Sequence, residues 1–428
     1  MFVKAISMTI SRSHVAIVLA CLWASTLARA ADWPGWRGPE RTGVSRETGL
    51  LKQWPPEGPK LLWKITGLGG GYSTPSMSGG RLFVMGSKGA EEFLMSLDVK
   101  DGHLLWSTRV GQVGENRGPN YPGPRSTPTV DGATVYTLGS DGDLLAADVL
   151  TGKIFWHRNL EKDFAGKRGT WAYTESVLID GDALVCTPGG STATMLALDK
   201  RTGAVRWQTA KPEYNTAGYA SAIVAEVGGV RQYIQFLGSG LIGVAADNGK
   251  PLWFYNKHIG GISAAAPIFH DGCVFSTAEG GDDAGGDALL RLNTDGKGVH
   301  ATQLYLVRAM MNHHGGAVLI GDYLYGTGSQ ALVCMDFKTG VRKWRERSVG
   351  QGSVAAADGR LYVRGVQGQV ALVEANPSGY REKGRFRQPN RSRFPTFCHP
   401  VIADARLYLR DDDVMLCYDL KEREAVSK

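Results

Sequence analysis

LDVKDGHLLW, at Leu97–Trp106, is the stretch of sequence that decides the fold, because it recurs along the chain. Its nearest copies read ADVLTGKIFW (Ala147–Trp156), LDKRTGAVRW (Leu198–Trp207) and MDFKTGVRKW (Met335–Trp344). In each copy an Asp is followed four residues later by Gly, and four residues after that by Trp. A motif that returns at a long and regular period indicates a repeat architecture.

Fainter copies extend the repeat to seven units. They read AADNGKPLW, LNTDG and VEANPSG, and end at Trp253, Gly296 and Gly379. The turn glycines of the seven units are Gly102, Gly152, Gly203, Gly249, Gly296, Gly340 and Gly379. Successive glycines lie between 39 (340 to 379) and 51 (152 to 203) residues apart. One four-stranded propeller blade occupies about 40–50 residues, so each unit is predicted to be a blade.

An eighth unit is divided between the two ends of the chain. LCYDLK (Leu416–Lys421) supplies an Asp without a Trp, and KLLWKITG (Lys60–Gly67) supplies a Trp without an Asp. Joining the two ends completes a blade and leaves no long sheet edge exposed. The sequence therefore predicts an all-β fold, an eight-bladed β-propeller whose last blade is closed by N- and C-terminal strands.

Each unit has the composition of a sheet of short antiparallel strands. Asp-Gly pairs such as Asp131-Gly132 and Asp358-Gly359 separate β-rich runs, which is a strong hairpin signal. No stretch of the mature chain shows a helical apolar period. We expect a signal peptide at 1–30, an N-terminal strap at 31–59 and one propeller domain at 60–425. The blade tryptophans are expected to be structural, filling the gaps between blades: Trp63, Trp106, Trp156, Trp207, Trp253 and Trp344.

The first thirty residues have the pattern of a secretory signal. Lys4 and Arg12 precede an apolar run at Val15–Leu22, and Ala28-Arg29-Ala30 is a small-x-small cleavage site. The run is shorter than the roughly 20 residues that a membrane span needs. We expect a periplasmic or secreted protein, cut after Ala30, with no transmembrane span. Acylation at Cys21 is the less favoured alternative.

Charge and cysteine content argue against two further classes. The formal charge is +7, and removal of the signal, with its three basic residues and no acid, leaves a mild excess. That excess does not favour nucleic acid, which usually meets a dense basic stripe. The basic run Arg381–Phe394 is either a docking surface for an anion or a solvated loop. No Cys-x-x-Cys occurs, which argues against zinc ribbons and c-type haem.

The Asp-x-x-Thr-Gly-x-x-x-Trp phrase resembles the pyrroloquinoline quinone (PQQ) repeat. This repeat is found in quinoprotein alcohol dehydrogenases and in outer-membrane assembly factors of the BamB type. DWPGWRGPERTGVS (Asp32–Ser45) and MNHHGGAVLIGDYLYG (Met311–Gly326) are similar to exported PQQ-like propeller proteins. The resemblance covers the mature chain and implies the propeller fold, but it does not imply one function.

The resemblance leaves three functions open. Quinoprotein dehydrogenases use a calcium-bound quinone, a catalytic Asp and commonly adjacent cysteines, and this chain has no Cys-Cys pair. We assign no catalytic residue and expect no cofactor, with PQQ and Ca²⁺ as the alternative. The expected function is a non-catalytic scaffold of the cell envelope, monomeric, that binds a protein partner or a small-molecule or glycan ligand. The alternatives are a PQQ-dependent oxidoreductase and a glycan-binding module.

Candidate binding residues stand just before each innermost strand, where a propeller's channel opens. They are Tyr72, Arg125, Tyr173, Glu175, Tyr219, His313, His314 and His399. Such side chains suit a small, flat or anionic ligand. The alternative is that they only form hydrogen bonds with strand ends and water at an ordinary polar channel rim. His313 and His314 are weak metal candidates, since no third ligand stands at a recognised spacing. Trp33, Trp36 and Arg37 either strap the disc or form an exposed contact.

Overall fold

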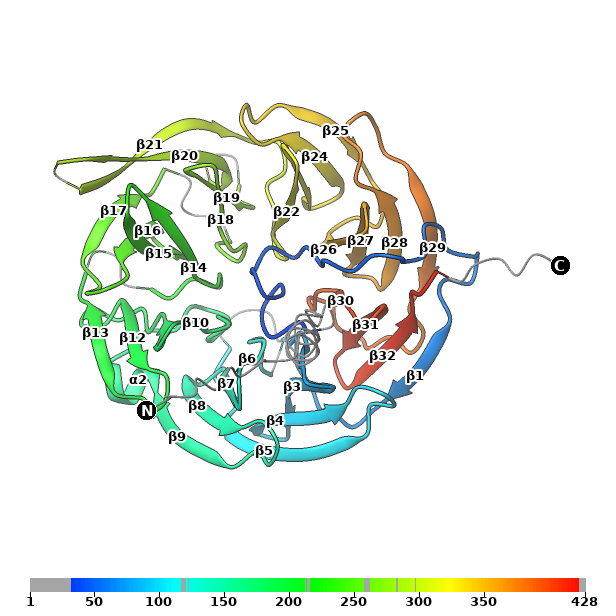
Figure 1. Ribbon diagram of the computed structural model, residues 1–428, viewed down its shortest axis with the longest axis horizontal. Coiled ribbons are helices and arrows are strands. Elements are labelled where there is room, and N and C mark those ends of the chain that lie inside the picture. Colours follow the sequence, from blue (N-terminus) through cyan, green and yellow to red (C-terminus); the bar gives the residue numbers. More distant parts are fainter. Residues whose placement is uncertain are drawn as a thin grey trace, which may run out of the picture. The chain divides into compact units, whose positions relative to one another are not determined.

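The chain forms a closed ring of four-stranded antiparallel sheets (Figure 1). The computed structural model describes residues 32–116, 121, 123–211, 213, 216–257, 262–281, 284–296 and 298–422. The expected signal, its cleavage site and Cys21 lie outside the described residues. Eight sheets are present within these ranges, which confirms the predicted eight-bladed propeller.

The blades follow one another in chain order, each with its innermost strand first. Blades 1 to 4 are β2 (Ser76–Ser78), β3 (Arg81–Lys88), β4 (Glu91–Asp98), β5 (Leu104–Gln112); β6 (Thr129–Asp131), β7 (Thr134–Leu138), β8 (Asp143–Asp148), β9 (Ile154–Asn159); β10 (Leu178–Asp180), β11 (Ala183–Cys186), β12 (Met195–Asp199), β13 (Val205–Thr209); and β14 (Ile223–Val227), β15 (Val230–Leu237), β16 (Gly240–Ala245), β17 (Pro251–Tyr255). Blades 5 to 8 are β18 (Ile268–His270), β19 (Cys273–Ala278), β20 (Gly286–Asp295), β21 (Gly298–Val307); β22 (Ala317–Ile320), β23 (Tyr323–Thr327), β24 (Leu332–Asp336), β25 (Arg342–Glu346); β26 (Gly352–Ala357), β27 (Arg360–Gly365), β28 (Gln369–Glu374), β29 (Glu382–Arg387); and β30 (Val401–Ala403), β31 (Arg406–Asp411), β32 (Val414–Asp419), β1 (Leu61–Ile65). The short helix α2 (Leu160–Phe164) follows β9.

Blade 8 is completed by both ends of the described chain, as predicted. Strand β1 pairs antiparallel with β32, with Trp63 opposite Cys417. The Asp419 N–H donates to the Lys60 carbonyl at 2.8 Å. Figure 1 shows the blue β1 alongside the red β32. Backbone pairing of the two ends therefore closes the ring of blades.

The repeated Asp-Gly-Trp motif forms contacts between neighbouring blades. Asp148 Oδ1 accepts from Thr151 N and Oγ1 at 2.8 and 2.7 Å, and Gly152 closes the turn at φ 72°. The Trp106 ring of blade 1 lies against this turn, so a side-chain carbon on Gly152 would come within 2.6 Å of it. Trp106 Nε1 also donates to the Val149 carbonyl at 3.0 Å. The Trp of one blade therefore anchors the turn of the next.

Three blades depart from this rule. Blade 7 has Lys383 where the Trp would stand, and blades 5 and 4 differ in the following ways. Blade 5 has no Trp at the expected place, and Tyr305 on β21 takes it, donating to the Phe337 carbonyl at 2.9 Å. A side-chain carbon on Gly340 would lie 3.1 Å from the Tyr305 ring. Trp253 is the third exception, because its Nε1 donates within blade 4, to Gln232 Oε1 at 2.7 Å.

The strap, residues 32–59, crosses the ring on the way to β1 (Figure 1). It bridges Trp33 to Met77 of blade 1 and Val44 to Ala356 of blade 7, and then Leu50 to Lys421. Arg37 is 4% exposed and donates to the carbonyls of Gly315, Ala317 and Thr42. The strap thus ties together inner strands of blades that are not neighbours in the ring.

Two of the remaining sequence features are accounted for by the fold. The five cysteines of the described part are unpaired and buried. In the basic run, Arg381 and Lys383 pair with Glu374, Arg385 pairs with Glu382 and Arg391 with Asp411, so four of its six cations form ion pairs. No helix among the described residues has the length and apolar character of a membrane span.

Candidate binding site

A cavity of about 390 Å³ opens where the eight blades meet. Every blade contributes to it a segment that precedes or adjoins its inner strands. The strap adds Trp36 to the wall. The lining side chains from the eight blades are Tyr72 and Thr74; Tyr121 and Arg125; Trp171, Thr174 and Ser176; Tyr219 and Ser221; Ile262 and Ala264; His313 and His314; Gln351, Val366 and Gln367; Pro395, Phe397 and His399.

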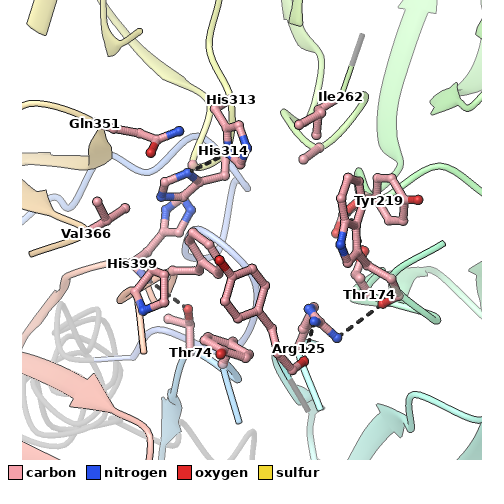
Figure 2. Close-up of a pocket in the computed structure, with 18 of the residues that line it drawn as sticks. Thr74, Arg125, Thr174, Tyr219, Ile262, His313, His314, Gln351, Val366 and His399 are labelled. Carbon is pink, nitrogen blue, oxygen red and sulfur yellow. Dashed lines mark hydrogen bonds between the residues drawn. The ribbon is translucent and has the colours of Figure 1, made fainter. Parts of the chain in front are cut away.

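Six of the eight predicted binding residues line this cavity. They are Tyr72, Arg125, Tyr219, His313, His314 and His399. Figure 2 shows the histidines on one side of the cavity and Tyr219 on the other, with Arg125 between them at one end. The structure therefore brings together residues that are up to 327 positions apart, from 72 to 399.

Tyr173 and Glu175 do not line the cavity. Consecutive residues of an extended segment face opposite ways, and here Thr174 and Ser176 face the channel. Tyr173 is buried between blades and donates to the Pro188 carbonyl at 2.9 Å. The prediction identified the correct segment of blade 3 but the wrong alternate residues. The packing of Tyr173 against blade 2 decides which residues of this segment face the channel.

Four large aromatic residues of the wall were not among the predicted ones: Trp36, Tyr121, Trp171 and Phe397. Phe397 stands two residues before His399. Trp171 stands two residues before Tyr173 but lines the cavity, because Ala172 between them has a left-handed backbone (φ 64°) that interrupts the extended segment. In an extended segment, residues two positions apart face the same side, so the predicted position of His399 could have indicated Phe397. No such rule reaches Trp36, because it comes from the strap.

The aromatic rings form a nearly continuous wall. Phe397 lies 5.3 Å from Tyr72, 5.6 Å from Tyr121 and 4.8 Å from His314, measured between ring centroids. Trp36 meets His399 edge-on at 4.4 Å. Such tilted and edge-to-face contacts stabilise each pair by about 0.5–1.5 kcal/mol beyond simple burial, so the wall is preorganised.

Arg125 places one cation in this aromatic cavity. Its guanidinium lies over the Tyr72 ring at 5.3 Å and donates to the carbonyls of Tyr121 and Trp171 at 2.6 and 3.1 Å. Burial lowers the pKa of Arg125, and the nearby Tyr72 and Glu92 act in the opposite direction. No carboxylate within the described part of the chain forms an ion pair with it. The cavity therefore has a fixed positive charge that a bound anion would neutralise directly.

Burial lowers the pKa of all three histidines, which favours their uncharged form at neutral pH. Burial lowers the pKa of His314 to about 3, with His313 adding repulsion. Burial, and then Arg37, lowers the pKa of His399 well below its usual range. His313 and His314 share a hydrogen bond of 3.1 Å between their Nδ1 atoms. Across the described ranges no group of three or more His, Cys, Asp or Glu side chains is arranged to hold a metal.

Three buried polar atoms of lining residues have no hydrogen-bond partner in the part of the chain that the structure describes. They are Trp36 Nε1, Tyr72 Oη and His314 Nε2. A buried polar group without a partner costs about 1–3 kcal/mol. Their position in one wall indicates hydrogen-bonding capacity that a bound molecule or ordered water would use.

The lining does not fit a calcium-bound quinone. Calcium takes six to eight oxygen ligands, with carboxylates prominent among them, and no described lining residue is an Asp or Glu. The Gly-rich stretch GGDDAGGD (Gly280–Asp287) holds three acids whose oxygens would suit calcium. Of these, Asp287 does not line the cavity and accepts from the N–H groups of Ala309, Met310 and Met311. Asp282 and Asp283 lie outside the described residues.

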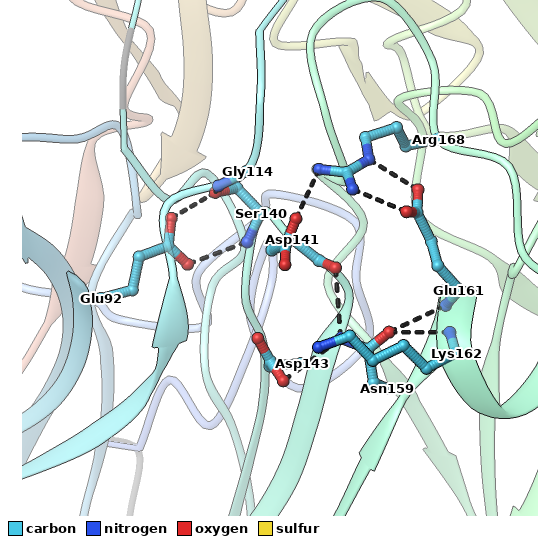
Figure 3. A network of polar contacts seen from close by, with 9 residues as sticks. All are labelled: Glu92, Gly114, Ser140, Asp141, Asp143, Asn159, Glu161, Lys162 and Arg168. Carbon is cyan, nitrogen blue, oxygen red and sulfur yellow. Dashed lines mark hydrogen bonds and ion pairs between the residues drawn. The ribbon is translucent and has the colours of Figure 1, made fainter. Parts of the chain in front are cut away.

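A polar network behind the cavity fixes the segment that carries Trp171 (Figure 3). Arg168 pairs with Asp141 of blade 2 at 2.7 Å and with Glu161 of α2 at 2.6 Å. Asn159 caps α2, its side-chain oxygen accepting from the N–H groups of Glu161 and Lys162. These bonds hold the chain three residues before Trp171, and so they position its indole in the wall.

Two buried carboxyl groups stand behind the wall. Glu92 accepts from Ser140 N at 2.8 Å (Figure 3), and Glu175 accepts from Thr187 N at 2.7 Å and from Gln235 Nε2 at 3.0 Å. Burial, only partly offset by these hydrogen bonds, raises the pKa of each to about 7.

This shift predicts a pH-dependent stability. A carboxyl whose folded pKa exceeds its unfolded value of 4.5 binds its proton more tightly when folded, so its contribution to stability falls as pH rises from 4.5 to 7. The loss is on the order of 3 kcal/mol for each group. We expect the double variant Glu92→Gln with Glu175→Gln to lose less stability than the unaltered protein between pH 5 and 8.

Urea midpoints measured across this range test the prediction. The quantity of interest is the difference between the double variant and the unaltered protein at each pH, because contributions of the histidines then cancel. Glu57→Gln, at an exposed position of the strap, is the matched control and should keep the original slope. Parallel pH profiles for the double variant and the unaltered protein would contradict the assignment.

Comparisons with known proteins place this architecture among its relatives. The sequence model of the family described as outer membrane protein assembly factor BamB matches residues 20–191 and 122–346. The chain is 32% identical to BamB of Yersinia pestis and 30% identical to BamB of Salmonella typhimurium, each over 91 residues. Each match covers 21% of this chain and 22% of the relative, so the curated relatives are matched over about a fifth of their length.

Solved structures show the same fold. BamB from Moraxella catarrhalis superposes with a TM-score of 0.57 and 14% identity, covering 85% of this chain and 98% of that one. Quinohemoprotein alcohol dehydrogenase from Comamonas testosteroni superposes with a TM-score of 0.62 and 13% identity, covering 95% and 82%. Both an assembly factor and an oxidoreductase thus share the ring, and function has to be argued from the site.

Proposed function

Because the chain belongs to the family of the outer membrane protein assembly factor BamB, we propose that it is a non-catalytic scaffold of the cell envelope. In this proposal it is exported by residues 1–30 and binds a protein or a ligand at the face of the ring on which the central cavity opens. The composition of the cavity wall carries the proposal. It combines aromatic rings, neutral histidines, hydroxyls and amides with one guanidinium that forms no ion pair with a described carboxylate.

This set of side chains supports binding better than catalysis. General acid–base chemistry needs a group whose pKa lies near the working pH and that reaches the reacting atom. Among the described lining residues there is no Asp, Glu, Cys or Lys, and the buried histidines hold their pKa values below the neutral range. Glu92 and Glu175 have pKa values of about 7 but lie behind the wall.

An oxidoreductase dependent on PQQ and Ca²⁺ is the competing function. A quinone of this kind would bring its own redox chemistry when bound, and it would need oxygen ligands for the metal. The described lining offers hydroxyls and amides but no carboxylate. The side chains therefore support the scaffold more than the dehydrogenase.

Two measurements test the proposal together. A photo-crosslinking amino acid placed at Trp171 in the native host should give one defined adduct, because Trp171 faces the cavity. The same probe at Phe155, which is 52% exposed on the outer strand of blade 2, is the control and should give none. Titration with PQQ and Ca²⁺ should give no saturable binding and no dye reduction with alcohols or sugars. Stoichiometric quinone binding with turnover would overturn the scaffold.

A further inference from the structure

Two further hollows adjoin the central cavity. One shares Trp171, Tyr219, Ile262 and His313 with it and continues past Lys167 and Glu279. The other shares Gln351, Val366 and Gln367 and continues past Arg345, Arg347 and Arg387. Figure 2 shows Ile262 and Tyr219 on the opposite side of the cavity from Gln351 and Val366. The three hollows therefore form one depression across the centre of the ring, which we call the trough.

The trough is cationic. The described residues that line it include Arg125, Lys167, Arg168, Arg345, Arg347 and Arg387, against only Glu279 and Glu346. Arg168 is paired with Asp141 and Glu161. The other five cations form no ion pair with a carboxylate in the described part of the chain. Three of them, Arg345, Arg347 and Arg387, are exposed and gather in one hollow.

Neutral hydrogen-bonding groups also line the trough, beside the rings and the charges. The hollow that holds the three arginines also presents Gln330, Gln351, Gln367 and Gln369, and the central cavity presents Thr74, Thr174, Ser176 and Ser221. Amides and hydroxyls both donate and accept hydrogen bonds, as the hydroxyls of a sugar do. Aromatic faces bury the apolar C–H face of a sugar ring, and guanidinium groups bind carboxylates in a bidentate manner.

We propose that the trough binds a linear acidic oligosaccharide, with the carboxylates of its sugars on Arg345, Arg347, Arg387 and Arg125 and one sugar ring held in the aromatic cavity. Three features favour this class over a compact ligand. The trough extends beyond a single pocket, five of its six cations form no ion pairs with described carboxylates, and its amides and hydroxyls can hydrogen-bond to the hydroxyls of a sugar. The inference rests on the proposed binding function and specifies its ligand. No bond is made or broken.

The direct test is calorimetric titration with hexagalacturonate, using maltohexaose as the uncharged oligosaccharide of equal length. We expect saturable binding of the acidic hexamer, weakened as salt rises because exposed charges are screened, and no measurable binding of the neutral one. The triple variant R345Q/R347Q/R387Q should weaken binding of the acidic hexamer about tenfold or more, since it removes three charge-assisted contacts.

A matched variant distinguishes the effect of the trough cations on binding from the effect of the protein's net charge. K60Q/K100Q/R201Q removes three exposed cations that do not line the trough and should bind the acidic hexamer as the unaltered protein does. Trp171→Phe tests the aromatic contribution while keeping a ring, and thermal unfolding of each variant verifies that it folds. Equal losses in both triple variants would overturn the assignment of the trough.

Other polyanions decide whether the ligand is a saccharide. Hexaglutamate and a single-stranded oligonucleotide of equal charge should bind more weakly than hexagalacturonate. Equal or tighter binding of either would overturn the saccharide class. If no polyanion binds while the probe at Trp171 still gives its defined adduct, the inference fails and the proposed scaffold function stands.

Discussion

Replacement of Arg410 by leucine is expected to destabilise the propeller more than any other single substitution that we propose. Arg410 lies on β31 of blade 8 and is fully buried. Its guanidinium donates to the carbonyls of Gly69, Ser73 and Met85, all in or next to blade 1, and to that of Asp412. It therefore joins the last blade to the first at the point where the ring closes.

The expected loss of stability follows from the buried backbone carbonyls that would lose Arg410 as their hydrogen-bond donor. Each buried carbonyl without a hydrogen-bond donor costs about 1–3 kcal/mol, and the leucine side chain cannot donate to any of them. We expect Arg410→Leu to lower the free energy of unfolding by about 4 kcal/mol or more, a large part of the roughly 5–15 kcal/mol typical of a whole protein. Arg410→Lys should restore little, because an ammonium lacks the planar fork that reaches several carbonyls at once.

Denaturant unfolding followed by tryptophan fluorescence measures this loss. Arg342→Leu is the matched control, since Arg342 is exposed on the outer strand of blade 6, and it should change stability by less than about 0.5 kcal/mol. If Arg410→Leu unfolds at the same denaturant concentration as the control, the closing joint does not depend on this side chain.

The second large effect is expected at the strap. Arg37 is 4% exposed, and its guanidinium holds the strap against the carbonyls of Gly315 and Ala317 beside blade 6. Burial lowers the pKa of Arg37 to about 10, so it stays charged at neutral pH. Arg37→Leu should lower the free energy of unfolding by about 3 kcal/mol and should release Trp36 from the cavity wall.

Two readouts make this prediction specific. Hydrogen exchange should rise at the backbone N–H groups of Ser45 and Ala356, which bridge the strap to blade 7, while the outer strands keep their protection. Ligand binding in the cavity should also weaken, because Trp36 forms part of its wall. Arg46→Leu is the control on the same strap, since the Arg46 side chain is 74% exposed. Unchanged exchange in Arg37→Leu would show that the strap is held by its backbone bridges alone.

The location of the binding cavity was partly accessible from the sequence. Choosing the residue before each innermost strand found Tyr72, Arg125 and Tyr219, because the blade pattern marks where every such strand begins. The same rule chose Tyr173 and Glu175, which face away from the channel. An error of one residue in an extended segment reverses its face, and nothing in the local sequence of blade 3 sets that phase.

The number of blades and the closure of the ring were determined by the sequence itself. The Asp and Gly of the motif form a turn within one blade, and its Trp rests on the turn of the next, as Trp106 does on Gly152. These contacts recur between neighbours in the chain, so a periodic motif records them. The spacing of about 40–50 residues then fixes the size of each blade.

The full composition of the cavity wall, and the whole of the trough, were decided only by the tertiary structure. Phe397, Trp36 and Trp171 stand at positions that the repeated motif does not mark, and they meet because eight loops and a strap converge when β1 pairs with β32. The unpaired state of Arg345, Arg347 and Arg387 likewise depends on which acids lie nearby in space. Repeated local contacts are recorded in the sequence as a pattern, whereas contacts among eight distant loops exist only after the ring has closed.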